Sequence, residues 1–94
     1  MLPELDPLLH AQLRLAVMST LVSRSSINFP DLRKLLKATS GNLSVQIKKL
    51  EKAEYLTIEK GYHNNYPQTT LKITEKGLKA FEDYVEALSK YLPK

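Results

Sequence analysis

The chain contains no cysteine and no tryptophan, and its 94 residues include only three glycines and two histidines. The absence of cysteine excludes a disulfide framework, a thiolate zinc site, a cysteine nucleophile and a thiol redox sensor. The histidines, His10 and His63, are 53 positions apart, and no carboxylates are spaced to complete a metal site with them. We therefore expect neither a metal nor a cofactor.

Long hydrophobic runs and targeting signals are also missing. The longest apolar run is the four residues 15–18, whereas about 20 are needed to cross a bilayer. The N-terminus lacks the basic segment, apolar core and small-residue cleavage site of a secretory signal. No glycine-rich phosphate loop and no serine, histidine and acid arrangement is found. We expect a cytoplasmic protein that makes no membrane contact and is not an enzyme.

The composition is that of a small globular protein, with 43% hydrophobic and 26% charged residues. The length allows one domain, residues 1–94, which would bury about 60–65% of its unfolded surface and gain stability from a second subunit. The net charge of +4 lies entirely in the middle of the chain. Residues 28–60 carry seven basic and four acidic side chains, and Lys72 adds one positive charge, while the segments 1–27 and 75–94 are neutral. A basic centre between neutral ends favours a polyanion-binding middle.

Apolar periodicity predicts two helices in the first part of the chain. The first covers residues 7–24, with Asp6 as N-cap and Pro7 in the first helical position. The second covers residues 29–38, with Asn28 as N-cap. Its basic residues Arg33, Lys34 and Lys37 fit phosphate contacts and an ordinary solvent face equally well.

A third helix is predicted over residues 40–53. Leu43, Ile47 and Leu50 form one narrow apolar stripe, and the opposite face is basic and polar. Two short helices joined by a tight turn, the second with a basic outer face, are typical of a helix-turn-helix.

The apolar period changes to two after Tyr55, which predicts a β-hairpin over residues 55–74. The polar stretch 62–68 is expected to form a long exposed loop at its tip.

The last helix is predicted over residues 75–92, with Thr74 as N-cap, and carries two apolar stripes. The first stripe comprises Leu78, Phe81, Val85, Leu88 and Leu92, and the second Ala80, Tyr84, Ala87 and Tyr91. One stripe can close the core of the chain, and we expect the second to meet a partner, because aromatic residues are enriched in interface cores. The expected dimer surface is Leu5, Leu8, Leu9, Tyr84, Ala87, Leu88 and Tyr91. The alternative is that both stripes fold into one monomeric core.

The ordered set of elements resembles the MarR/ArsR-like winged helix-turn-helix regulators over residues 5–92. Segment 39–56, TSGNLSVQIKKLEKAEYL, is similar to their recognition helix and the strand after it, and segment 69–77, TTLKITEKG, to the second wing strand and the start of the last helix. The resemblance implies a mainly α fold with a small antiparallel β-hairpin (α+β) and a C-terminal dimerisation helix. It also implies a homodimer that binds duplex DNA and regulates transcription. The chain departs from the pattern at Glu54, where the family usually has glycine, and at the wing tip, where Asn64 and Asn65 replace arginine.

The resemblance identifies two sets of candidate DNA-binding residues. The recognition-helix set is Ser40, Gly41, Asn42, Ser44, Val45, Gln46, Lys48 and Lys49. The wing set is Lys60, His63, Asn64, Asn65, Tyr66 and Lys72. Asn42 and Gln46 suit adenine edges, Val45 suits a thymine methyl, and lysines suit phosphates. The alternatives are an ordinary solvated helix face and an ordinary polar hairpin tip.

The sequence therefore favours a dimeric regulator that reads a pseudo-palindromic DNA site. A second hypothesis is a winged helix used as a protein-interaction module of a larger complex, because the fold supports both uses. A basic and polar outer face on the third helix favours DNA over a protein partner. RNA is disfavoured, since no aromatic stacking platform is evident. Nothing in the sequence marks a small-molecule effector site.

Overall fold

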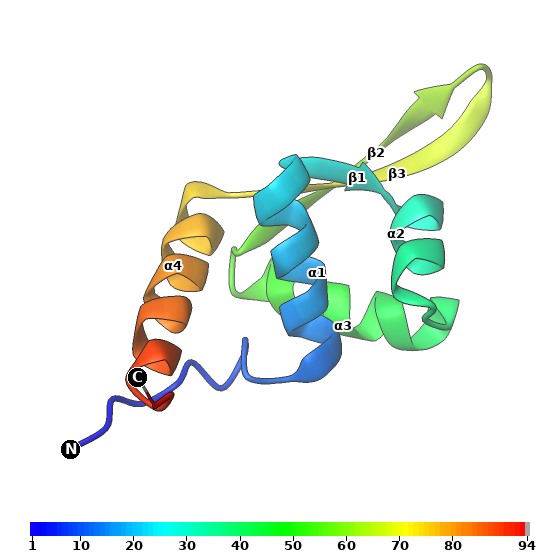
Figure 1. Ribbon diagram of the computed structural model, residues 1–94. Helices are drawn as coiled ribbons and strands as arrows, with labels where there is room; N and C mark the ends of the chain where they lie inside the picture. Colours follow the sequence, from blue (N-terminus) through cyan, green and yellow to red (C-terminus); the bar gives the residue numbers. More distant parts are fainter. Residues whose placement is uncertain (94) are drawn as a thin grey trace.

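The computed structural model describes residues 1–93, which form four helices and one small antiparallel sheet (Figure 1). The helices are α1 (Gln12–Arg24), α2 (Phe29–Leu36), α3 (Ser40–Lys52) and α4 (Glu75–Ser89). The strands are β1 (Ser26–Asn28), β2 (Leu56–His63) and β3 (Tyr66–Ile73), in the order β1-β3-β2. This arrangement confirms the expected winged helix fold class. Within residues 1–93, no helix is long and apolar enough to cross a membrane.

Three polar side chains fix where α2, α3 and α4 begin. The side chain of Asn28 accepts a hydrogen bond from the Asp31 amide at 2.9 Å, and that of Thr39 accepts one from the Asn42 amide at 3.2 Å. Thr74 Oγ1 accepts one from the Gly77 amide at 2.9 Å. Each cap satisfies an amide that has no partner inside its own helix, so these starts follow from local sequence.

The first helix starts five residues later than expected. Asp6 Oδ1 accepts from the Leu8 amide at 2.9 Å and Asp6 O accepts from the His10 amide at 2.8 Å, so a single turn follows Pro7. Ala11 then takes an extended conformation, with φ −149° and ψ 127°, and α1 begins at Gln12. Asp6 therefore forms a side-chain cap as predicted, but it caps an isolated turn and not α1.

Three helix ends also differ from the expectation, although α3 ends at Lys52, only one residue early. Helix α2 ends at Leu36 because Lys37 takes a left-handed conformation with φ 52°. Helix α4 ends at Ser89 and not at residue 92.

The strands of the wing are longer and its turn is shorter than the sequence suggested. The strands pair as far as His63 and Tyr66, so only Asn64 and Asn65 form the turn. Both asparagines have positive φ, 52° and 67°, as a two-residue hairpin turn of type I′ requires, and asparagine tolerates this conformation. The expected loop over 62–68 is therefore mostly paired strand, and the wing extends well beyond the helices (Figure 1).

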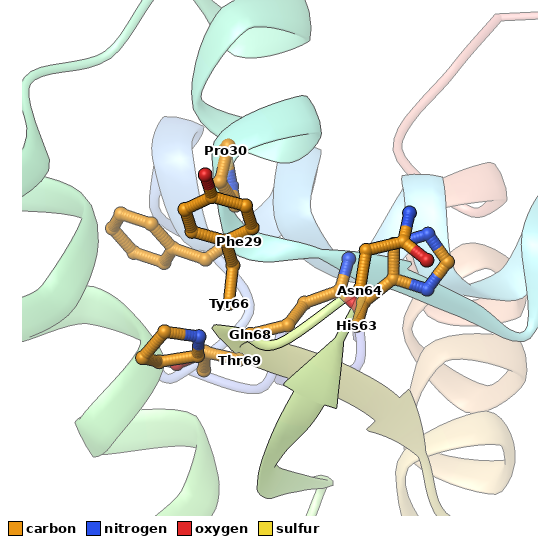
Figure 2. A pocket seen from close by; sticks show the side chains of 8 residues that line it. Phe29, Pro30, His63, Asn64, Tyr66, Gln68 and Thr69 are labelled. Atoms are coloured by element: carbon orange, nitrogen blue, oxygen red, sulfur yellow. The ribbon is translucent and has the colours of Figure 1, made fainter.

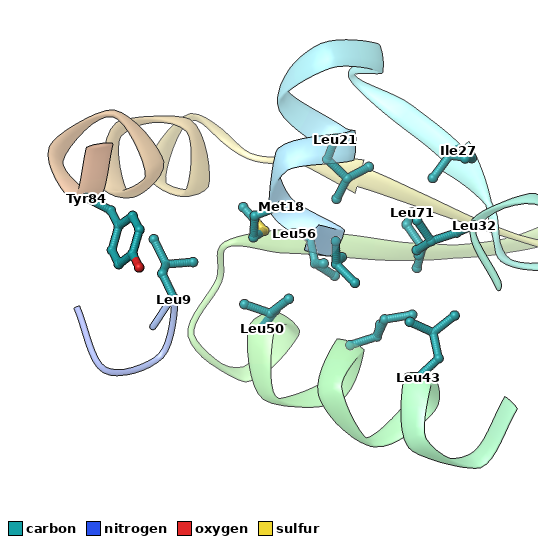
Figure 3. Close-up of a cluster of buried hydrophobic side chains, with 12 residues drawn as sticks. Leu9, Met18, Leu21, Ile27, Leu32, Leu43, Leu50, Leu56, Leu71 and Tyr84 are labelled. Atoms are coloured by element: carbon teal, nitrogen blue, oxygen red, sulfur yellow. The ribbon is translucent and has the colours of Figure 1, made fainter. Parts of the chain in front are cut away.

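The core lies between α1, α3 and one face of the sheet (Figure 3). The predicted α3 stripe of Leu43, Ile47 and Leu50 is buried. It packs in one cluster with Met18 of α1 and Leu71 of β3.

Helix α4 begins in close contact with the backbone that follows α3. Gly77 is buried, and a Cβ atom at this position would lie 2.0 Å from Tyr55 O. Thr74 Oγ1 donates to Glu54 O at 2.6 Å, and the Thr74 amide donates to Tyr55 O at 3.2 Å. These contacts join the end of α3, the sheet and α4 in one junction, formed by Glu54, Tyr55, Thr74 and Gly77.

The N-terminal segment, residues 1–10, is fastened to this junction and to the opposite end of α4. Tyr55 Oη donates to Asp6 Oδ2 at 2.6 Å, and Tyr91 Oη donates to Pro3 O. Burial, together with the Asp6 hydrogen bond, raises the pKa of Tyr55 to about 12. Tyr55 thus stays protonated and keeps this hydrogen bond at neutral pH.

Replacing Gly77 with alanine is expected to lower the free energy of unfolding by about 2 kcal/mol, because the new methyl meets backbone that cannot move cheaply. Gly41→Ala is the matched control, since nothing lies within 4 Å of a Cβ there. The control should be neutral or stabilising by up to about 1 kcal/mol. Urea denaturation measures both variants, and equal effects would contradict the close approach.

Replacing Glu54 with glycine is expected to raise the free energy of unfolding by about 1 kcal/mol, because Glu54 is left-handed with φ 65°. Its carboxylate lies 4.0 Å from Lys76 Nζ, and both side chains are exposed, so the lost pair contributes little. Glu54→Gln keeps the strain and should leave stability unchanged. If urea denaturation finds Glu54→Gly no more stable than Glu54→Gln, the turn is unstrained.

Candidate nucleic-acid interface

Most of the outer face of α3 is exposed. Asn42, Val45, Lys48 and Lys49 are exposed, while Ser44 is half-buried. Val45 leaves 51% of its surface in contact with solvent, although its neighbours on this face are polar or charged. This face therefore offers hydrogen-bonding groups, positive charge and one apolar contact side by side.

A groove of about 250 Å³ separates α3 from the wing. Its lining residues are Phe29, Ser44, Ile47, Lys48, Ile58, Lys60, Thr69 and Leu71. Lys48 comes from α3 and Lys60 from β2, so the groove has a positive side chain from each of its two walls. Such a groove suits a phosphate backbone.

The strand register places the wing lysines on different faces of the sheet. Lys60 lies on the same face as Ile58, toward α3. Lys72 pairs with Thr57 and points to the opposite face, because neighbouring residues of a strand alternate in direction. The structure thus brings Lys60 to α3 and leaves Lys72 on the other face of the sheet.

The tip of the wing encloses a second hollow against the start of α2 (Figure 2). His63 and Tyr66, which pair across the hairpin, line it together with Asn64, Phe29 and Pro30. Phe29 lines both hollows, yet no signal in a single sequence separates it from an ordinary core phenylalanine. Asn65, at the end of the turn, is exposed.

The two amides expected to read bases are already hydrogen-bonded within the protein. Gln46 Oε1 accepts from Arg14 Nη1 at 2.6 Å, and Gln46 Nε2 donates to Asn42 Oδ1 at 3.0 Å. Arg14 was not among the residues predicted from the sequence. A usable signal was present, since Arg14 is a charged residue between Leu13 and Leu15, on the apolar first half of its helix.

The expected dimer surface is corrected by the structure. Leu9 is fully buried and Tyr84 is 4% exposed, so both lie in the chain's own core. Tyr84 Oη is hydrogen-bonded to His10 Nδ1 at 2.9 Å, and Tyr91 is bonded to Pro3 O. The N-terminal segment covers this stripe of α4 at Tyr84, and of the stripe only Tyr91, at its far end, is exposed, by 41%. The other members, Leu5, Leu8, Ala87 and Leu88, are half-buried.

The first stripe of α4 is the one left open. Leu78, Val85 and Leu92 are 39%, 49% and 60% exposed. Val22 of α1 and Phe81 line a shallow hollow with Leu78 and Val85, so the open apolar surface continues from α4 to α1. We call this surface, Val22, Leu78, Phe81 and Val85, the outer α4 face.

Comparison with known proteins gives a family match over most of the chain. A family model described as a winged helix DNA-binding domain matches residues 13–92. The uncharacterized protein MJ0432 of Methanocaldococcus jannaschii is 30% identical over 76 residues, which cover 81% of this chain and 83% of that protein.

Solved structures give the same fold. The structure of a transcriptional regulator homologue from Pyrococcus horikoshii OT3 superposes with a TM-score of 0.85 and 27% identity, covering 89% of this chain and 83% of that one. Reduced AbfR bound to DNA superposes with a TM-score of 0.77 and 23% identity, covering 86% of this chain and 58% of that one. AbfR is a protein of Staphylococcus epidermidis. At this identity the likeness to AbfR concerns the fold alone.

Proposed function

The chain belongs to the winged helix DNA-binding domain family, and from that membership we propose that it is a sequence-specific transcriptional regulator that binds duplex DNA as a homodimer. The family consists of DNA-binding domains and not of enzymes. The likeness to a regulator homologue of P. horikoshii supports a role in transcription. A protein with this role works beside the chromosome, and we place it in the cytoplasm.

The observation that carries the proposal is the groove with Lys48 on one wall and Lys60 on the other. With α3 in the major groove, the adjacent phosphate strand would pass between the helix and the wing. Gly41 supports this orientation, because the open space around it leaves the first turn of α3 accessible to a phosphate.

The proposed contacts divide by chemistry. Asn42, Ser44 and Val45 face the base edges, while Lys48, Lys49 and Lys60 hold phosphates. At the wing tip, His63, Asn64, Asn65 and Tyr66 would contact backbone or the minor groove. Lys72 is left out of the interface, because it lies on the face of the sheet opposite Lys60 and at the base of the wing, where β3 also pairs with β1.

Removing one groove lysine should weaken binding to all sequences by a similar factor. We expect Lys48→Gln and Lys60→Gln each to reduce the slope of log affinity against log salt concentration by about one. Lys79→Gln is the control, since Lys79 lies on α4 and its ammonium is held 2.8 Å from Asp83. The measurement is a titration of duplex DNA, selected from a random pool of about 30 base pairs, at several salt concentrations.

The selection itself tests the function. A palindromic motif with half-sites about 34–36 Å apart, or a multiple of that distance, supports a dimeric reader. Retention without a motif would indicate a non-specific binder held by its lysines. No retention even at low salt would contradict DNA binding and favour the protein-interaction module.

The proposed homodimer uses the outer α4 face. This surface is apolar and open, and a 94-residue chain gains stability by burying it. Its polar rim includes Glu82, Glu86 and Ser89, which suits an apolar centre with a solvated edge. A second copy with the same face satisfies the two-fold symmetry of a palindromic site.

Val85→Asp should convert the dimer to a monomer, because it would bury a carboxylate without a partner. Val45→Asp is a matched control, since Val45 and Val85 are 51% and 49% exposed on different helices. The control should stay dimeric and lose DNA affinity. Light scattering after size-exclusion chromatography measures the mass, and a Val85→Asp variant that remains dimeric would rule out this face.

A further inference from the structure

Arg14 links the N-terminal turn to the recognition helix α3. Its Nε donates to Leu8 O at 2.6 Å, and its Nη1 donates to Gln46 Oε1 at 2.6 Å. Arg14 is half-buried, and its guanidinium can only donate hydrogen bonds. Whatever group faces it on α3 must therefore be an acceptor.

Because Arg14 only donates, it determines the orientation of the Gln46 side-chain amide on α3. Gln46 must turn its oxygen to Arg14, which leaves Nε2, a donor, on the side of Asn42. Asn42 Oδ1 accepts from that Nε2 at 3.0 Å. The two side chains lie one helical turn apart, so the bond follows the α3 surface.

The outcome is a fixed polarity for the Asn42 amide. Its oxygen is turned toward Gln46, and among residues 1–93 its Nδ2 donates to no protein atom. The side chain of Asn42 is exposed on the outer face of α3. Asn42 thus presents N–H donors outward.

We propose that Arg14 is a specificity-determining residue that acts through Gln46 and makes Asn42 read acceptor edges in the major groove. This inference rests on the proposed DNA-binding function. Guanine offers acceptors at N7 and O6, and thymine offers O4. The paired contact with adenine, expected from the sequence, needs the oxygen and the nitrogen of the amide to face the base together, but the oxygen is turned toward Gln46 Nε2. Cytosine offers only a donor, and adenine places its N6 donor beside its single acceptor, N7. We therefore expect guanine or thymine opposite Asn42.

The variant Gln46→Glu tests the polarity directly. A carboxylate at this position still accepts from Arg14, but it cannot donate to Asn42. The Asn42 amide then turns over to donate to it and presents Oδ1 outward. The preferred base at the Asn42 position should change from guanine or thymine to cytosine or adenine, with a reversal of about tenfold in relative affinity. Asn42→Ala identifies that position, because it relaxes preference there.

Arg14→Met supplies a second variant with a different expected result. Without the donor, Gln46 can take either orientation, so the preference at the Asn42 position should relax without reversing. Arg24→Met is the control, since Arg24 is an exposed arginine of the same helix. It removes the same charge and should leave the base preference unchanged.

A measurement on the protein without DNA keeps the two proposals separable. The side-chain amide signals of Asn42 and Gln46 in ¹H–¹⁵N spectra should move in Arg14→Met and stay in place in Arg24→Met. The inference would be overturned if the Asn42 amide signals had the same chemical shifts in Arg14→Met as in the unchanged protein. It would also be overturned if a folded Gln46→Glu variant kept the original base preference. A protein that retains no duplex overturns the proposed function and this inference together.

Discussion

The close approach of α4 to the backbone at Tyr55 is the constraint on which the rest of the structure depends. Only glycine fits at position 77, because a Cβ would lie 2.0 Å from a carbonyl oxygen. Thr74 reinforces the contact by capping α4 and bonding to Glu54 O with the same hydroxyl. The junction therefore fixes where α3 ends, where the wing begins and the direction in which α4 leaves the sheet.

The junction also determines the shape of the groove between α3 and the wing. Lys48 and Lys60 belong to elements separated in sequence by the turn at Glu54, so their relative position depends on that turn. The strain of a left-handed glutamate there is tolerated, because its carbonyl oxygen accepts from Thr74 Oγ1 and its amide donates to Glu51 O. Stability at this point and the geometry of the proposed interface have the same physical origin.

Local features of the sequence were sufficient to predict much of the fold. The N-caps of α2 and α4 and the α3 stripe depend on residues within one or two turns of each other, and they appear as expected. The predicted start of α1 and the predicted buried side of α4 were wrong, because both features depend on contacts between residues far apart in the sequence. Nothing near Tyr84 in the sequence shows that His10 will bond to it, 74 positions away. The prediction of a long loop at the wing tip was wrong for another reason. A polar stretch is typical of a loop, but two residues, Asn64 and Asn65, are enough to form this turn.

The same distinction applies to the candidate site. Exposure and charge on α3 follow from helical spacing, so the sequence could identify Asn42, Val45 and Lys48 as outward-facing. The direction of an amide does not follow from spacing, because Asn42 and Gln46 each carry a donor and an acceptor. The orientation of the Gln46 amide depends on Arg14, which lies 32 positions earlier and can only donate. Arg14 also bonds to the N-terminal turn at Leu8, so the segment that covers one stripe of α4 is connected to the groups proposed to meet DNA. One series of contacts therefore runs from Tyr84 of α4 through the N-terminal segment and Arg14 to Gln46 of α3. The outer α4 face takes no part in it and remains open to a partner.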